Sequence, residues 1–215
     1  MTIQIKICGL STPETVDAAV DAGATHIGLV HFAPSPRHLE AEEAARLRTR
    51  VPPSVKVVLL TANADPLTLA NAVAAVKPDI LQFHGRESPE WLGAIREQTG
   101  MEVWKGIGLR DAGTLARSVK WVGKSDRLIW DAPAKALPGG NGETFDWSLL
   151  AGHEHAVPWG LAGGLTPANV AEAARITGAT LVDTSSGVER EKGIKDAGLI
   201  RAFCEAARSS PPRSC

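Results

Sequence analysis

The sequence predicts a single α/β domain of the (β/α)₈ class, the TIM barrel. Short aliphatic or β-branched runs alternate with Ala-rich segments of helical spacing from end to end, which is the pattern of repeated βα units. The strand-like runs number eight, and the 215 residues contain no linker, low-complexity block or change of composition. We therefore expect residues 1–208 to form one barrel and residues 209–215 to form a disordered tail.

Each expected strand is a short run rich in aliphatic or β-branched residues. These runs lie at residues 3–9, 26–32, 55–61, 80–85, 103–109, 127–133, 159–164 and 180–185. Eight strands that are each followed by a helix close naturally into a barrel, whereas an open doubly wound sheet of this length usually has fewer strands.

The expected helices lie at residues 13–22, 41–50, 66–76, 89–99, 111–120, 147–150, 167–177 and 196–208. Four of them begin with a proline that directly follows a capping residue; these capping residues are Thr12, Asp65, Ser88 and Thr166. The side-chain oxygen of such a residue accepts from a free N–H of the first turn, and proline has no N–H to leave unpaired. Glycines at 23, 100 and 178 stand where three helices are expected to end.

Composition excludes several classes of protein. The formal net charge is -1, so no bulk field attracts nucleic acid or an anionic membrane. The three cysteines, at positions 8, 204 and 215, are widely separated and form no metal-binding pattern, which favours a reducing cytoplasm and no metal. No segment resembles a signal peptide or offers the roughly 20 apolar residues of a membrane span. We expect a cytoplasmic monomer, with a dimer as the alternative.

In a barrel of this class, functional side chains lie at the C-terminal ends of the strands. In the first strand Ile5 and Ile7 alternate with Lys6 and Cys8, so Cys8 is expected to face the barrel interior near its mouth. A thiol there either serves as a base or is an inert buried group. As a base it needs a neighbouring cation such as Lys6, or a charge on the substrate.

Two aspartates end buried strands. Asp131 follows an apolar run in the sixth strand, and a carboxyl group there acts either as a general acid or as an acceptor for loop N–H groups. Asp183 in the eighth strand has the same two interpretations, and we favour the structural one.

The last two loops indicate an anion site. Gly163 and Gly164 follow the seventh strand, and Ser185, Ser186 and Gly187 follow the eighth. Backbone N–H groups of these two loops commonly hold a phosphate in such barrels, because glycine lets the backbone approach closely.

Two further side chains are candidates for the mouth of the barrel. Arg37 follows the second strand and suits a carboxylate, although an isolated loop arginine is also a common solvated charge. His84 ends the fourth strand, where it either contacts substrate or is a satisfied hydrogen-bonding group. The glycine-rich segment 137–145 is either a mobile cover or a long connection.

Six ordered motifs together resemble the phosphoribosylanthranilate isomerase family of tryptophan biosynthesis over essentially the whole barrel. They are KICGL at 6–10, FAPSPRH at 32–38, LQFHG at 81–85, DAP with GNGETFDW at 131–147, LAGGLTPANV at 161–170, and VDTSSGVE with GIKD at 182–196.

The resemblance implies an Amadori rearrangement of N-(5-phosphoribosyl)anthranilate without cofactor or metal. Asp131 would donate a proton to the ribose ring oxygen, and Cys8 would remove the proton from sugar C2. Arg37 would meet the anthranilate portion, and the residues of the last two loops would surround the phosphate. The small-molecule substrate is the only partner that the resemblance implies.

Departures from the family pattern concern the pocket surroundings, chiefly His31 and His38, which stand where aliphatic or aromatic residues are more usual. Two other hypotheses remain. The first is another phosphate-binding barrel enzyme, such as indole-glycerol-phosphate synthase, tryptophan synthase α-subunit or a pentose-phosphate epimerase. The second is a barrel that binds a phosphorylated metabolite without catalysis. Retention of both Cys8 and Asp131 argues against the second.

Overall fold

A computed structural model of the chain describes residues 2–133 and 144–209, and it confirms the predicted barrel. Eight parallel strands pair in sequence order, and the last strand closes on the first. The strands are β1 (Gln4–Cys8), β2 (His26–Val30), β3 (Lys56–Thr61), β4 (Ile80–Phe83), β5 (Glu102–Gly108), β6 (Arg127–Asp131), β7 (Trp159–Leu161) and β8 (Leu181–Thr184). Most of these strands end one to three residues before their predicted C-terminal boundary, because the last predicted residues already belong to the following loop.

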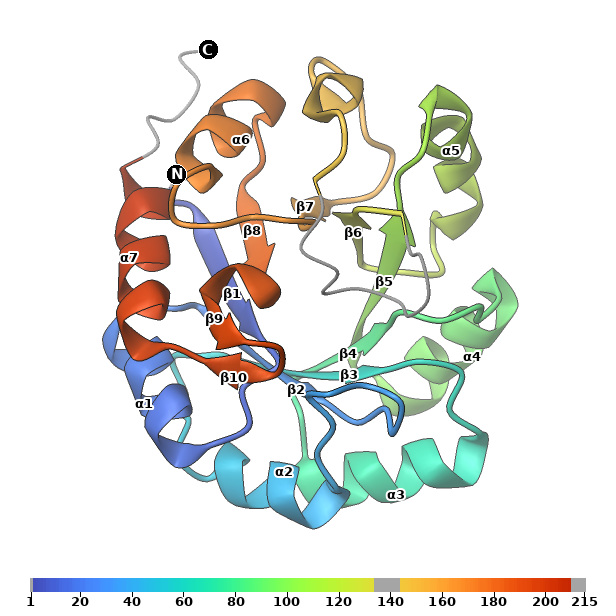
Figure 1. Cartoon of the computed structure of the whole chain (residues 1–215). Coiled ribbons are helices and arrows are strands. Elements are labelled where there is room, and N and C mark those ends of the chain that lie inside the picture. The colour runs from blue at the N-terminus through green and yellow to red at the C-terminus, as the bar shows by residue number, and fades with distance from the viewer. Residues whose placement is uncertain (1, 134–143, 210–215) are drawn as a thin grey trace.

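Helices surround the barrel on all sides (Figure 1). They are α1 (Pro13–Asp21), α2 (Ala41–Arg48), α3 (Pro66–Val76), α4 (Pro89–Thr99), α5 (Ala112–Ala116), α6 (Val170–Thr177) and α7 (Ala197–Arg208). Short 3₁₀ helices add η1 (Arg117–Trp121), η2 (Trp147–Leu150) and η3 (Ser186–Val188). The predicted helix at 111–120 is therefore α5 followed by a 3₁₀ turn. No helix among the described residues is both long and apolar enough to cross a membrane.

Three of the four predicted helix caps are confirmed. The side chains of Thr12, Asp65 and Ser88 each accept from an N–H in the first turn of α1, α3 and α4. The prediction for Thr166 is wrong, because α6 begins only at Val170. There the Thr166 N–H instead donates to Oδ1 of Asn169, 2.7 Å away, and this bond organises the loop before the helix.

The barrel wall separates two apolar cores. Outward-facing strand residues such as Ile5 and Ile7 pack with helix residues such as Val16 and Phe203, as the alternation in the first strand predicted. Inside the barrel a smaller cluster fills the end away from the loops; its members are Val58, Ile80, Trp104, Ile129, Ala162 and Leu181. The alternation of side chains across each strand therefore leaves the loop end of the interior for polar groups.

A small hairpin after β8 was not predicted. Strands β9 (Glu189–Glu191) and β10 (Ile194–Lys195) pair antiparallel within the connection to α7. The hairpin lies in front of β1 in Figure 1. It contacts the loop after β2, since a Cβ on Gly193 would come within 2.8 Å of the carbonyl oxygen of Pro36. The strands of two and three residues are too short to give a periodic signal.

Candidate active site

One cavity at the C-terminal ends of the strands brings together the ten residues that the sequence analysis proposed as catalytic, substrate-binding or phosphate-binding. Its lining includes Cys8, Arg37, His84, Asp131, Gly163, Gly164, Asp183, Ser185, Ser186 and Gly187. These residues come from β1, the loop after β2, the end of β4, and β6 to the loop after β8. The cavity therefore has a thiol and carboxyl groups in its wall and glycine-containing loops at one end.

Cys8 is the last residue of β1 and is 6% exposed. Gly28 is its register partner in β2, and a Cβ on Gly28 would lie 2.8 Å from the Cys8 sulfur, so glycine provides the space that the thiol occupies. Burial raises the pKa of the Cys8 thiol, and the charge of Lys6 only partly opposes this shift. The protein surroundings therefore favour the protonated thiol at neutral pH.

Lys6 and Asp183 form a buried ion pair beneath the cavity. Strand register places the two residues opposite each other on β1 and β8, and Nζ donates to Oδ2 over 2.7 Å. The second carboxylate oxygen, Oδ1, has no hydrogen-bond partner among the described residues, and Asp183 lines the cavity. Asp183 thus pairs with a buried lysine instead of accepting the loop N–H groups that we expected, and its Oδ1 is an acceptor available to a ligand.

Asp131 ends β6 with its two oxygens in different surroundings. Oδ1 accepts the N–H of Ala132 over 2.8 Å, and Oδ2 lies 3.3 Å from Nε2 of His84. The imidazole occupies space that a side chain on β5 would fill, since a Cβ on Gly106 would lie 2.8 Å from the ring. With Oδ1 bound to a backbone N–H, Oδ2 is the oxygen that can carry a proton toward a substrate.

The loops after β7 and β8 are in direct contact. A Cβ on Gly187 would lie 1.9 Å from the carbonyl oxygen of Leu165, so only glycine allows this approach. The same carbonyl accepts from Oγ1 of Thr184 over 2.7 Å. Gly163 and Gly164 both have positive φ, which turns the backbone of the β7 loop toward the cavity. The two loops therefore lie against each other at the cavity, where the sequence predicted an anion site.

Arg37 is buried, and its guanidinium is bound on one side by the hairpin. Nε donates to Oε1 of Glu189 over 2.6 Å, and Nη2 donates to Oε2 over 2.9 Å. The interpretation as a solvated surface charge is therefore wrong. The bidentate pair fixes the plane of the guanidinium at the cavity wall.

Sequence reasoning missed the roles of Glu189 and Lys195. Both belong to motifs quoted above, yet Glu189 matters through its pair with Arg37, 152 residues away, and Lys195 through its bonds to Glu189 and Ser185. Gln82 was missed as well: it lines the cavity, is 1% exposed, and neither amide atom has a partner among the described residues. A polar residue in the middle of the apolar run of the fourth strand was the signal that could have identified it.

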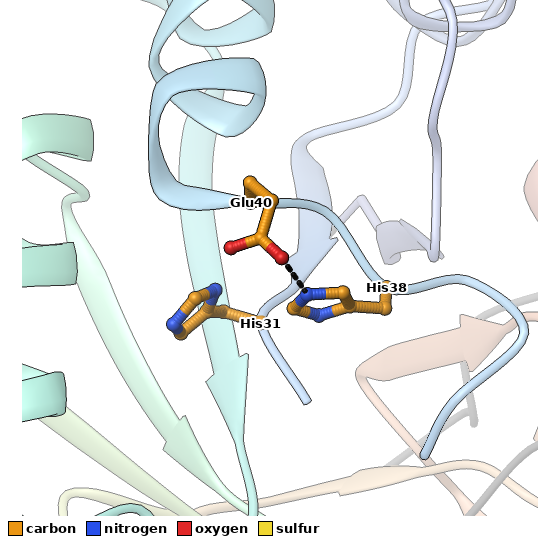
Figure 2. A group of neighbouring side chains, drawn as sticks. All are labelled: His31, His38 and Glu40. Atoms are coloured by element: carbon orange, nitrogen blue, oxygen red, sulfur yellow. Dashed lines mark hydrogen bonds and ion pairs between the residues drawn. The ribbon is translucent and has the colours of Figure 1, made fainter. Parts of the chain in front are cut away.

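Figure 2 shows three side chains of the described residues that lie within metal-ligand distance of one another: His31, His38 and Glu40. The Phe32 N–H donates to Nδ1 of His38 over 3.0 Å, so the neutral imidazole carries its proton on Nε2, which faces Glu40 at 3.1 Å. A metal at Nε2 would require the proton to move to Nδ1, and Nδ1 could then no longer accept the Phe32 N–H. These three side chains therefore fit a hydrogen-bonded group that orders the loop after β2 better than they fit a metal centre.

Fold and site together define a class: a (β/α)₈-barrel enzyme that acts on a small anionic metabolite by acid–base chemistry. The model of the N-(5'phosphoribosyl)anthranilate (PRA) isomerase family matches residues 5–206. The N-(5'-phosphoribosyl)anthranilate isomerase of Erythrobacter litoralis is 63% identical over 206 residues, which cover 96% of this chain and 99% of that protein. The chain therefore belongs to the PRA isomerase family.

Solved structures agree with this assignment. The phosphoribosyl anthranilate isomerase of Thermotoga maritima matches with a TM-score of 0.87 at 30% identity, covering 95% of this chain and 98% of that one. Another phosphoribosyl anthranilate isomerase matches with a TM-score of 0.84 at 29% identity and the same coverage. That structure contains reduced 1-(o-carboxyphenylamino)-1-deoxyribulose 5-phosphate.

Proposed function

We propose that this protein isomerises N-(5'-phosphoribosyl)anthranilate to 1-(2-carboxyphenylamino)-1-deoxyribulose 5-phosphate, a step of tryptophan biosynthesis. The observation that carries the proposal is the convergence on one cavity of a thiol, a carboxyl group and two glycine-containing loops, at Cys8, Asp131 and the loops after β7 and β8. Family membership supports the same reaction.

Two proton transfers account for the chemistry. Asp131 donates a proton from Oδ2 to the ribose ring oxygen, the C1–O bond breaks, and the amine nitrogen forms a C=N bond. This iminium acidifies the neighbouring C2–H, and Cys8 removes that proton to give an enolamine. The enolamine then gains a proton at C1 and loses the proton of its C2 hydroxyl to give the aminoketose, so substrate and product have the same composition and no oxidant or reductant is needed. A positioned acid or base typically contributes about 10²–10⁴-fold to such a transfer.

Charge on the substrate favours ionisation of the Cys8 thiol. Burial raises the pKa of Cys8, so the thiol needs help to become a thiolate. Lys6 lies behind it as a buried cation, and the iminium forms on the substrate side. The iminium adds a positive charge that favours the anionic form of the sulfur just when C2–H becomes acidic. Lys6 acts in the same direction, and its ion pair with Asp183 reduces that effect.

The ends of the substrate are assigned by charge. Arg37, held by Glu189, binds the anthranilate carboxylate, while Gly163, Gly164, Ser185, Ser186 and Gly187 hold the phosphate. Asp183 Oδ1 and His84 face the ribose between these ends. The reaction requires neither cofactor nor metal, since no external electron or Lewis acid enters the scheme above. We propose a cytoplasmic monomer; size-exclusion chromatography with light scattering tests the oligomeric state.

The experiment is an assay with freshly generated phosphoribosylanthranilate, followed by the loss of its anthranilate-type fluorescence. Turnover well above the spontaneous rate is expected from the purified chain. A rate no faster than the spontaneous one would refute the proposed activity and would favour a barrel that only binds a phosphorylated metabolite. Liquid chromatography with mass spectrometry checks the identity of the product, which should have the mass of the substrate but a different retention time.

A further inference from the structure

We propose that Lys195 is a positioning residue that sets the direction of two hydrogen-bond donors in the phosphate site, the Ser185 hydroxyl and the Ser186 N–H. The inference rests on the phosphate position in the proposed function and adds to it a residue that does not touch substrate. Its support is the complete hydrogen bonding of one buried ammonium group.

The ammonium of Lys195 has three protons and three acceptors. Nζ donates to the Ser185 carbonyl oxygen over 2.8 Å, to Ser185 Oγ over 3.1 Å and to Oε1 of Glu189 over 2.6 Å. The Lys195 side chain is 0% exposed. The hairpin places it there, because Lys195 and Glu189 are register partners on β10 and β9. An ammonium can only donate, so each of these contacts has a fixed polarity.

Fixed polarity at Lys195 determines what Ser185 can do. Since Oγ accepts from Nζ, the single hydroxyl hydrogen of Ser185 is left to donate elsewhere, and Ser185 lines the cavity. The Ser185 carbonyl is also bound to Nζ, and in a trans peptide the following N–H points the opposite way. The Ser186 N–H therefore points away from Lys195. The Ser185 hydroxyl and the Ser186 N–H are thus both left to donate to a phosphate, because Lys195 occupies the two oxygens of Ser185.

Glu189 links this arrangement to the other end of the site. Its carboxylate accepts from Lys195 and Arg37 on Oε1, and from Arg37 and the Gly193 N–H on Oε2. One carboxylate therefore connects Lys195 to Arg37, and protein groups alone supply the three acceptors of the Lys195 ammonium.

Titration of Lys195 gives the inference a specific signature. Burial lowers the pKa of its ammonium to about 8, with Glu189 opposing the shift, Arg37 adding to it and Cys8 opposing it weakly. A neutral amine has a lone pair that can accept the Ser185 hydroxyl hydrogen, which would turn that donor away from the cavity. Affinity for an anion of constant charge should therefore fall as the pH rises through 8.

Sulfate is the test ligand, because it remains a dianion from pH 6 to pH 9. Calorimetry or competition against turnover measures its dissociation constant for the wild type, Lys195→Met and Lys105→Met. Lys105 is the matched control: it is also buried and ion-paired, at 2.8 Å from Glu87, but it does not line the cavity that holds Cys8 and Ser185. Expected at pH 7 is a loss of about 10-fold or more in Lys195→Met, and less than about threefold in Lys105→Met.

Two further measurements complete the test. Wild-type affinity for sulfate should decrease between pH 7 and pH 9, and that decrease should be absent in Lys195→Met. In a Ser185→Ala background, Lys195→Met should cost less than in the wild type, because one of the two donors is already gone. Equal losses in Lys195→Met and Lys105→Met, or a flat wild-type pH profile, would overturn the inference even if turnover is normal. The expected sulfate results without turnover would instead leave the inference standing and remove the proposed reaction.

Discussion

Nε2 of His84 lies 3.3 Å from Oδ2 of Asp131, while Oδ1 of the same carboxyl group is occupied by the Ala132 N–H. The histidine therefore contacts the oxygen from which a proton would leave. Asp131→Asn should reduce kcat by about 10²–10⁴-fold, since an amide cannot act as the acid. His84→Leu should reduce kcat by about 10-fold with a smaller change in KM, and His84→Gln should lose less, because its amide can still contact Oδ2. Steady-state kinetics on the three variants measure this order; Leu and Gln variants of equal activity would contradict it.

Cys8 and Cys204 make a matched pair for testing the base. Both are buried, but Cys204 lies in α7 against the outer core, away from the cavity. Cys8→Ser should lower kcat by about 10²–10⁴-fold, because a hydroxyl is a far weaker base than a thiolate. Cys204→Ser should keep near-normal kcat. Circular dichroism verifies that both variants fold, and a Cys8→Ser enzyme with wild-type turnover would rule out the assigned role.

Recognition of the substrate carboxylate should depend on Arg37. Arg37→Met removes the guanidinium and should raise KM by about 10- to 100-fold with a smaller change in kcat. Arg127→Met is the control, because Arg127 is half-buried at the start of β6 and bonds the Trp159 carbonyl at the far end of the barrel. A similar KM increase in both variants would mean that Arg37 acts only through general stability.

Stability should decrease in mild acid because of His26. Burial lowers the pKa of His26 to about 4, and repulsion from Lys6 and Arg127 adds to the shift. In the unfolded chain His26 binds a proton near pH 6.5, whereas in the folded protein it stays neutral down to about pH 4. The neutral buried histidine therefore contributes its full stability above pH 6.5, and this contribution is lost as the pH falls toward 4. Urea unfolding at pH 7 and pH 4.5 should show a loss to which His26 contributes up to roughly 3 kcal/mol. The slope should be smaller in His26→Asn; an unchanged slope would exclude His26 as its source.

Close contact between the last two loops can be tested at Gly187. Gly187→Ala places a Cβ 1.9 Å from the Leu165 carbonyl oxygen, so the backbone must move, at a cost of about 1–3 kcal/mol. The same movement should raise KM through the phosphate site. Gly113→Ala in α5 is the control, because a Cβ there would meet only side-chain atoms, Arg117 Nη1 at 3.2 Å and Asp111 Oδ1 at 3.3 Å, so a much smaller change in stability and an unchanged KM are expected. Thermal unfolding and KM together measure both effects, and a stable Gly187→Ala enzyme with normal KM would show that the loops can separate.

Much of the fold was predictable because its signals are local. The alternation of Ile5 and Ile7 with Lys6 and Cys8 was enough to assign the inner and outer faces of β1. Capping followed the same rule at Thr12, Asp65 and Ser88. It failed at Thr166, where an asparagine three residues later bonds the loop N–H instead. The segment 137–145, for which two interpretations were open, falls largely outside the described residues, as does the tail after residue 209.

The sequence by itself determined the eight βα units, the strand ends that line the cavity, and the family whose motifs those ends carry. Only the tertiary structure decided which charges meet. Lys6 and Asp183 are 177 residues apart, and Arg37 and Glu189 are 152 apart. Such pairs depend on barrel closure, on strand register and on the position of the β9–β10 hairpin. None of these leaves a periodic pattern in the sequence. The catalytic candidates were therefore visible in the sequence, whereas the groups that hold them in place were not.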